Sequence, residues 1–304
     1  MNQYTNILPA AIQPVYDSDG NMTYDGKWGY VWDAENRLVA ALPVVTNQGS
    51  VRLRFAYDYM SRRVGKEVET WTGMEWSNVV TIAFTYDGWN MVRETRSDES
   101  KPNYYVWGLD LSGTPQGAGG VGGLLARVRQ ENIPHPLYYA SDANGNITDV
   151  LNTNGTLAAH YEYDPFGNIV ALSGDLAGIN PFRFSSKYWD EEVGVYYYGY
   201  RFYSPEMARW INRDPIEERG GLNLYVLAQN TPANTIDPLG LLQDHVSYAV
   251  YLSGLGGGID VDTDTQMKDC CSDDGKMVKN GDIKLELTVK GLRRAWAWYL
   301  RLYF

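Results

Sequence analysis

The sequence has little cysteine and no long apolar run. Its only two cysteines, Cys270 and Cys271, are adjacent, which is a poor geometry for a disulfide with each other. They therefore build no disulfide framework and, alone, no four-ligand zinc site. No apolar run reaches 18 residues, which excludes a transmembrane helix, so we expect no membrane partner except at the far C-terminus.

Positive charge is also scarce, with 26 Lys and Arg against 37 Asp and Glu and a formal net charge of −11. Broad nucleic-acid binding through phosphate neutralisation needs clustered basic residues, so it is excluded for most of the chain. The first residues, MNQYTNILPAAIQPVY, lack the basic start and apolar core of a secretory signal. Such a chain is cytoplasmic, leaves by a dedicated secretion machine, or is the tail end of a longer gene product, which we favour.

The residues that are abundant suit strands and turns. The chain contains 24 Tyr, 10 Trp and 31 Gly, and it is poor in the Ala, Leu, Glu and Lys mixture that is typical of helices. This composition predicts an all-β protein.

A repeated theme supports that prediction: a Tyr-Asp pair, a Gly or Asn turn, and an alternating strand. It occurs at residues 15–25, 56–71, 85–95 and 138–172. Asp-Gly and Asn-Gly supply the positive φ angles of two-residue hairpin turns. The spacing is irregular, so we expect a strip of hairpins that stack on their neighbours, not a solenoid of fixed period.

A glycine-rich loop interrupts the strip. Residues 117–122, GAGGVG, match the GxGxxG pattern, but no βαβ unit surrounds them and no acidic residue follows at the required distance. We therefore interpret them as a flexible loop between hairpins and not as a dinucleotide site.

Two Asp-Pro dipeptides, at Asp214 and Asp237, lie 23 residues apart, and Arg213 directly precedes the first. Two carboxylates that are brought close together share a proton, so that one acts as a base on water and the other as an acid to a carbonyl. Arg213 would lower the pKa of one aspartate, orient it, or tie down the loop. Asp-Pro is also common turn chemistry, as at Asp164-Pro165, so the alternative of two ordinary turns stays open.

The runs YEYDPFGNIVALSG and NPFRFSSKYWDEEVGVYYYGYRFYSPEMARWINRDPIEERGGLNLYVLAQNTPANTIDPLGL closely resemble the RHS repeat-associated core domain. The upstream units resemble the YD repeats of RHS proteins and of the C components of Tc insecticidal toxin complexes. The resemblance implies a spiralling strip of β-hairpins that forms part of a hollow shell. It divides the chain into a YD-repeat strip (1–160), the core domain (161–241) and a variable C-terminal region (242–304).

The resemblance also implies a function. In that family the core resembles an aspartyl autopeptidase that cuts after the motif DPxGL and frees an enclosed C-terminal cargo. The motif here ends at Leu241, so the bond at risk joins Leu241 to Leu242, and the catalytic positions fall on Asp214, Asp237 and Arg213. No cofactor or metal is expected. The expected partners are the chain's own C-terminal region as cargo, an immunity protein and a secretion machine, with a secreted or cell-surface location.

An alternative of another class is an adhesive surface scaffold, in which exposed Tyr and Trp rings bind carbohydrate or protein partners. The tail, 242–304, carries weak signals only. Asp260, Asp262 and Asp264 alternate as in a calcium loop but lack its Gly and Glu, and His245 has no recognisable nucleophile nearby. Residues 283–289 alternate like a strand, and 291–304 resemble either an interfacial helix or a final core element.

Overall fold

The computed structural model describes residues 2–7, 12–129 and 135–241, together with three two-residue strands farther along the chain. The chain divides into two compact units, Met1–Leu242 and Gln243–Phe304. In the second unit β19 (Ala249–Val250), β20 (Ile259–Asp260) and β21 (Thr288–Val289) pair in that order. The side chains discussed for the tail, including those of His245 and both cysteines, lie outside the described residues.

The first unit confirms the all-β prediction. Fourteen strands form one antiparallel sheet in which each strand pairs with the next along the chain. No helix among the described residues is long and apolar enough to cross a membrane. The strands are β1 (Val15–Tyr16), β2 (Met22–Tyr24), β3 (Trp28–Trp32), β4 (Leu38–Pro43), β5 (Val51–Tyr57), β6 (Arg63–Trp71), β7 (Trp76–Asp87), β8 (Asn90–Arg96), β9 (Asn103–Trp107), β10 (Leu124–Arg129), β11 (Leu137–Ser141), β12 (Ile147–Leu151), β13 (Leu157–Tyr163) and β14 (Ile169–Ser173). The boundary expected at 160/161 falls inside β13, so the sheet is continuous across it.

An aspartate at the end of a strand organises several of the hairpin turns. Asp17 Oδ1 accepts hydrogen bonds from the amides of Asp19 and Asn21 at 3.0 and 2.8 Å. Asp17 also closes a three-residue loop, because its amide donates to Asn21 O and its carbonyl accepts from Gly20 N. The expectation of a two-residue turn is therefore wrong here, although two-residue loops do follow Asp25 and Asp87. Because the carboxylate holds the loop amides, the turn needs only one residue with a positive φ, which is Gly20 at 88°. The same pattern recurs at Asp33, Asp58, Asp142 and Asp164.

In several Tyr-Asp pairs the tyrosine ties the end of its strand to the neighbouring strand. Its ring lies against the core, and its hydroxyl donates to the carbonyl of the residue that follows the previous turn. The bonds are Tyr57 to Leu38 (2.7 Å), Tyr86 to Arg63 (2.9 Å) and Tyr163 to Ile147 (2.8 Å). Tyr57-Asp58 and Tyr163-Asp164 thus each supply both the turn and a tie to the adjacent strand.

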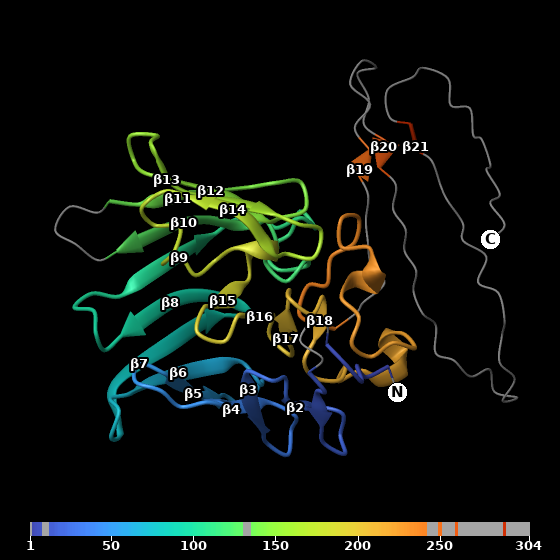
Figure 1. Ribbon diagram of the computed structural model, residues 1–304. Helices are drawn as coiled ribbons and strands as arrows, with labels where there is room; N and C mark the ends of the chain where they lie inside the picture. The colour runs from blue at the N-terminus through green and yellow to red at the C-terminus, as the bar shows by residue number, and fades with distance from the viewer. Residues whose placement is uncertain are drawn as a thin grey trace, which may run out of the picture. The chain divides into compact units, whose positions relative to one another are not determined.

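The sheet curves, and a smaller four-stranded sheet lies on its concave side (Figure 1). The small sheet consists of β15 (Tyr188–Asp190), β16 (Val195–Tyr197), β17 (Phe202–Ser204) and β18 (Arg209–Trp210), with the 3-10 helices η1 (Phe184–Ser186), η2 (Glu217–Gly220) and η3 (Ala228–Asn230) around it. Aromatic rings join the two sheets, with centroids 5.7 Å apart for Phe55 and Phe202 and 5.4 Å apart for Phe84 and Tyr188. At this end of the strip the interior is therefore packed with protein.

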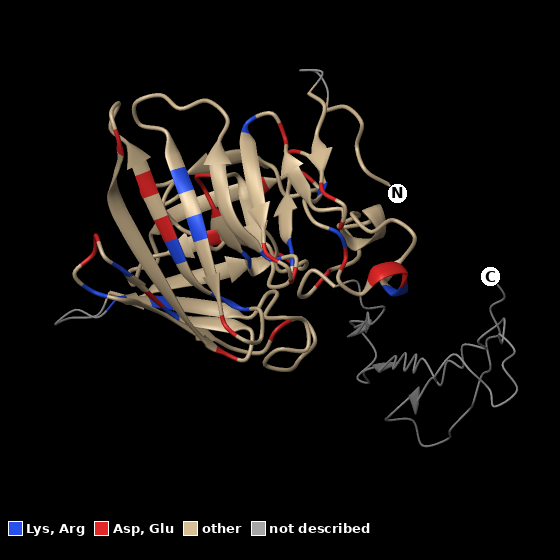
Figure 2. Ribbon diagram, turned by 90° about the horizontal axis from the view of Figure 1, so that it is seen from below, with Lys and Arg blue, Asp and Glu red and all other residues tan. Residues whose placement is uncertain are grey.

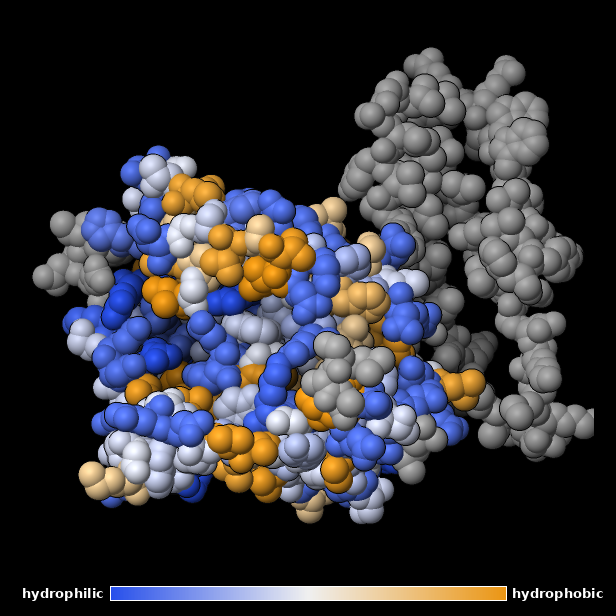
Figure 3. Space-filling model, viewed as in Figure 1, coloured by the Kyte–Doolittle hydropathy of each residue, from blue (hydrophilic) through white to orange (hydrophobic). Residues whose placement is uncertain are grey.

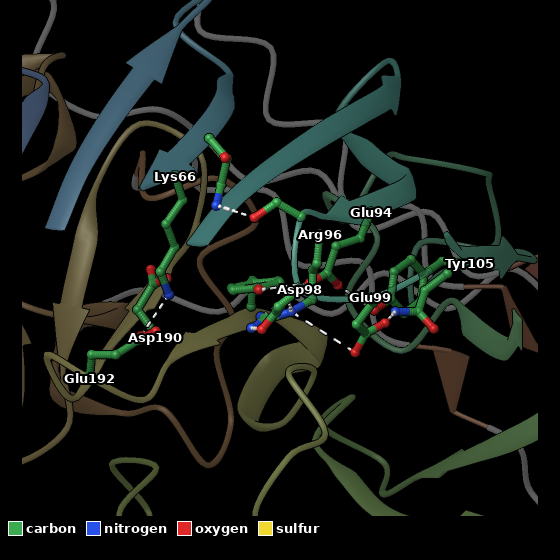
Figure 4. A network of polar contacts seen from close by, with 12 residues as sticks. Lys66, Glu94, Arg96, Asp98, Glu99, Tyr105, Asp190 and Glu192 are labelled. Atoms are coloured by element: carbon green, nitrogen blue, oxygen red, sulfur yellow. Dashed lines mark hydrogen bonds and ion pairs between the residues drawn. The ribbon is translucent and has the colours of Figure 1, made fainter. Parts of the chain in front are cut away.

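A buried charged group also joins the sheets. The residue after each turn is usually aliphatic and fully buried, as at Met22 and Leu38, but β6 begins with Arg63 at this position. Its Nη1 pairs with Asp190 Oδ2 at 2.5 Å, and Lys66 Nζ lies 2.8 Å from Asp190 Oδ1. Figure 4 shows Lys66 reaching Asp190 and Glu192 next to a second polar group around Arg96. Losing one partner of such a pair would leave an uncompensated buried charge.

The outer surface is mixed and polar. Arg52 of β5 pairs with Glu69 of β6 at 2.6 Å, and bands of opposite charge face each other across neighbouring strands in Figure 2. On the face shown in Figure 3, apolar residues form small patches between hydrophilic ones. Tyr59, Tyr104 and Tyr138 are among the exposed rings, whereas every tryptophan that the structure describes is at least partly covered.

Candidate active site

Asp214 and Asp237 lie on either side of one guanidinium group. Arg201 Nη2 is 2.9 Å from Asp214 Oδ2 and 3.1 Å from Asp237 Oδ2, so these two oxygens are no more than about 6 Å apart. All three side chains are almost completely buried. Two Asp-Pro dipeptides that are distant in the sequence therefore contribute to one charged cluster.

Each aspartate also caps the backbone that follows it. Asp214 Oδ1 accepts the amide of Ile216 at 3.0 Å, in the bend before η2. Asp237 Oδ1 accepts the amide of Leu241 at 2.8 Å, which closes the DPLGL segment on itself. As in the turns of the strip, a carboxylate holds amides two or four residues ahead. In both cases the second oxygen is left to face Arg201.

Arg201 lies in the segment between β16 and β17 and is held on several sides. Its guanidinium stacks 4.3 Å from the centre of the Trp210 ring, and its Nη1 donates to Leu224 O at 3.2 Å. Its Nε donates to the carbonyl of Gly240, inside the DPLGL segment. One side chain thus contacts both aspartates and the backbone of the motif. Burial lowers the pKa of Arg201, and the charges of the two aspartates oppose that shift.

The environment favours a proton on Asp237. Burial raises the pKa of this carboxyl above its usual value, and the negative charge of Asp214 acts in the same direction. The positive charge of Arg201 and the hydrogen bond from Leu241 oppose the rise. A neutral acid and a neighbouring carboxylate are the pair that proton transfer to and from a peptide bond requires.

Arg213 lies outside this cluster. Its side chain is 36% exposed, and its Nη2 is 3.3 Å from Glu217 Oε1 on η2. The cation between the aspartates is Arg201, which the sequence analysis did not single out. Its only sequence signal is its place in the run YYYGYRFY, which resembles the core domain. Leu241 is half-buried, and Leu242 falls outside the described residues.

The glycine-rich loop packs directly beside the site. Asp110 Oδ2 accepts the amides of Ala118 and Gly120 at 2.7 and 3.1 Å, and the residues from 118 to 121 are buried. The loop is a packed support and not the flexible connection that we expected. A Cβ atom added to Gly119 would lie 2.3 Å from Pro238 O, so only glycine permits this approach.

Comparison with known proteins agrees with the fold and with the resemblance. A family model described as Teneurin YD-shell matches residues 122–233. The tRNA nuclease WapA of Bacillus subtilis is 29% identical over 247 residues, which cover 79% of this chain and 9% of that protein. Double-stranded DNA deaminase toxin A of Burkholderia cenocepacia is 29% identical over 241 residues, 74% of this chain and 16% of that protein.

Solved structures show the same architecture. The crystal structure of TcdB2-TccC3-TEV matches with a TM-score of 0.59 and 25% identity, over 74% of this chain and 11% of that chain. The crystal structure of TcdB2-TccC3 matches with a TM-score of 0.58 and 24% identity over the same shares. The fold is that of a YD-repeat shell, and the chain is similar to the RHS-type YD-repeat shell proteins. It spans about a tenth to a sixth of the length of the relatives that it matches.

Proposed function

We propose that this chain is the part of a toxin shell that cuts itself once, after Leu241, with Asp237 as the acid and Asp214 as the base. The observation that carries the proposal is the contact of one buried group, Arg201 Nη2, with both carboxylates at 2.9 and 3.1 Å. Leu241, the residue before the bond, is itself hydrogen-bonded to Asp237. The substrate would be the chain's own backbone.

The chemistry balances within the site. Water adds to the carbonyl carbon of Leu241 while Asp214 takes a proton from it and Asp237 gives a proton to the carbonyl oxygen. The nitrogen of Leu242 then receives the proton from Asp214, and the bond between carbon and nitrogen breaks. Asp237 regains a proton as the new carboxyl group forms. Arg201 keeps its charge throughout and holds the two carboxylates in place.

The released segment, residues 242–304, would be cargo. Two relatives that match the shell region are named as a tRNA nuclease and as a DNA deaminase toxin, which supports a shell that carries an effector. An immunity protein, a secretion machine and delivery outside the producing cell follow from the same proposal. No specific observation favours the adhesive alternative.

The test is the intact mass of freshly purified protein. Wild type should give two fragments divided after Leu241, whereas Asp214→Asn and Asp237→Asn should give one uncut chain. Asp164→Asn is a matched control, because it alters an Asp-Pro dipeptide whose carboxylate serves only a hairpin turn. It should cut like wild type. An uncut wild-type chain, or fragments that persist in both site variants, would overturn the proposal and leave a binding scaffold.

A further inference from the structure

A second buried cation, Lys187, also contacts the cleavage motif. It binds the carbonyl of Pro238, whereas Arg201 binds that of Gly240. Lys187 lies between η1 and β15 and is only 7% exposed. Its ammonium group donates to Pro238 O at 2.5 Å and to Gly119 O at 2.8 Å. One side chain therefore bridges the DPLGL segment and the glycine-rich loop.

Successive carbonyls of the motif each have a different donor. Pro238 O accepts from Lys187, Leu239 O accepts from the amide of Tyr200 at 3.1 Å, and Gly240 O accepts from Arg201 Nε. The last two donors are neighbours on one segment, whereas Lys187 comes from another. Lys187 anchors the carbonyl next to Asp237, so its removal would free that end of the motif first.

We propose that Lys187 is a positioning residue for self-cleavage, which holds the Pro238 carbonyl on the glycine-rich loop and so keeps Asp237 aligned with Arg201 and Asp214. The inference rests on the proposed function. Lys187 acts through Asp237, because the carbonyls that it holds are those of Pro238 and Gly119. A small displacement of a reacting group costs about a hundredfold in rate, so the loss of this anchor should be measurable.

The surroundings of Lys187 make its hydrogen bonds to the two carbonyls dependent on pH. Burial lowers the pKa of its ammonium to about 8, and the charges of Asp237 and Asp110 oppose that shift. The ring of Tyr198 lies 5.3 Å away, and Arg63 lines a cavity of about 40 Å³ that Lys187 also lines. A cavity of this size admits water, which gives the ammonium a partner for proton exchange. Above about pH 8 the neutral amine has lost one donor, and its hold on the carbonyls weakens.

The experiment measures the first-order rate of cleavage from pH 5 to 10 in the full chain. In addition to the fall that loss of the Asp237 proton causes, the rate of wild type should show a separate step down as pH rises through about 8. Lys187→Met should cut about a hundredfold more slowly and lose this alkaline step. Lys187→Arg should keep most of the rate and move the step to higher pH, because guanidinium stays charged. A circular dichroism spectrum for each variant shows whether the fold is intact.

Hydrogen exchange gives a readout that does not depend on cutting. In an uncut Asp214→Asn background, Lys187→Met should speed exchange at the amides of Leu239, Gly240 and Leu241 at least tenfold, and leave β5 and β6 unchanged. Lys187→Arg should restore slow exchange. If wild type and Lys187→Met show equal rates, equal pH profiles and equal exchange, the positioning role of Lys187 is overturned and the proposed function still stands. An uncut wild type would instead overturn the proposed function on which the inference rests.

Discussion

The amide of Leu241 donates a hydrogen bond to Oδ1 of Asp237 at 2.8 Å. The carboxyl group to which we assign the acid role is thus attached to the residue whose carbonyl would be attacked. The DPLGL motif therefore contributes both a reacting group and the substrate, and its closed shape brings the two together. This relationship and the position of Arg201 underlie the predictions on cleavage, and the buried pair of Arg63 and Asp190 underlies those on stability.

The rate of cleavage should fall as pH rises through the pKa of Asp237. Burial raises that pKa above its usual value, so Asp237 keeps its proton to higher pH than an exposed aspartate and loses it as pH rises further. A time course of fragment formation between pH 4 and 8 measures this. A rate that increases steadily with pH over this range would contradict the role of Asp237 as acid.

Arg201→Gln should abolish cleavage, because both carboxylates lose the charge that holds them. The change also leaves two buried carboxylates uncompensated, and a loss of about 3 kcal/mol or more in the free energy of unfolding is expected. Urea unfolding and intact mass measure the two effects.

Arg213→Gln is the matched control for that variant. The Arg213 side chain pairs with Glu217 at 3.3 Å at the surface, so its loss should change stability by less than about 1 kcal/mol and leave the rate unchanged. Loss of cutting in Arg213→Gln with an intact fold would show that this residue serves the site, as the sequence resemblance implied.

Gly119→Ala should slow cleavage while both aspartates and Lys187 remain. Gly119 has a φ of 60°, and an added Cβ would meet Pro238 O at 2.3 Å, so the DPLGL segment has to move. Gly113→Ala is the control, because its φ is 73° but its Cβ position is open. If both variants slow cutting equally, backbone strain and not contact with the motif is responsible.

Arg63→Met should destabilise the first unit although methionine occupies the equivalent position in another hairpin. Asp190 would lose the nearer of its two cationic partners and remain fully buried, at a cost of about 3–5 kcal/mol. Adding Asp190→Asn should recover part of this cost. Urea unfolding of the two variants and wild type measures it, and a fully stable single variant would contradict the assignment.

The same pair predicts acid sensitivity. Arg63 and Lys66 outweigh burial and hold the pKa of Asp190 below 3.8. A carboxyl whose folded pKa is depressed contributes stability above its unfolded pKa, and this stability is lost as pH falls through the folded value. Below about pH 4 the stability of wild type should therefore decline more steeply than that of the double variant.

Local sequence patterns were enough to predict the strip of hairpins. The turn aspartate, the residue with positive φ and the tyrosine act within a few residues of one another, so their pattern is visible in the chain and predicts hairpins in sequential order. The exact form of the turn was missed, because the hydrogen bonds of the carboxylate that select a three-residue loop are not evident from Asp and Gly alone.

Tertiary structure alone decided the composition of the site. Arg201 is 36 positions from Asp237, and Lys187 is 68 positions from Gly119. No local periodicity records such contacts, because they arise only when the small sheet packs on the concave face of the strip. Sequence spacing favoured Arg213, the neighbour of Asp214. The side chain of Arg213 instead lies at the surface and pairs with Glu217. Arg201 is buried, packs on the Trp210 ring and lies between the two carboxylates.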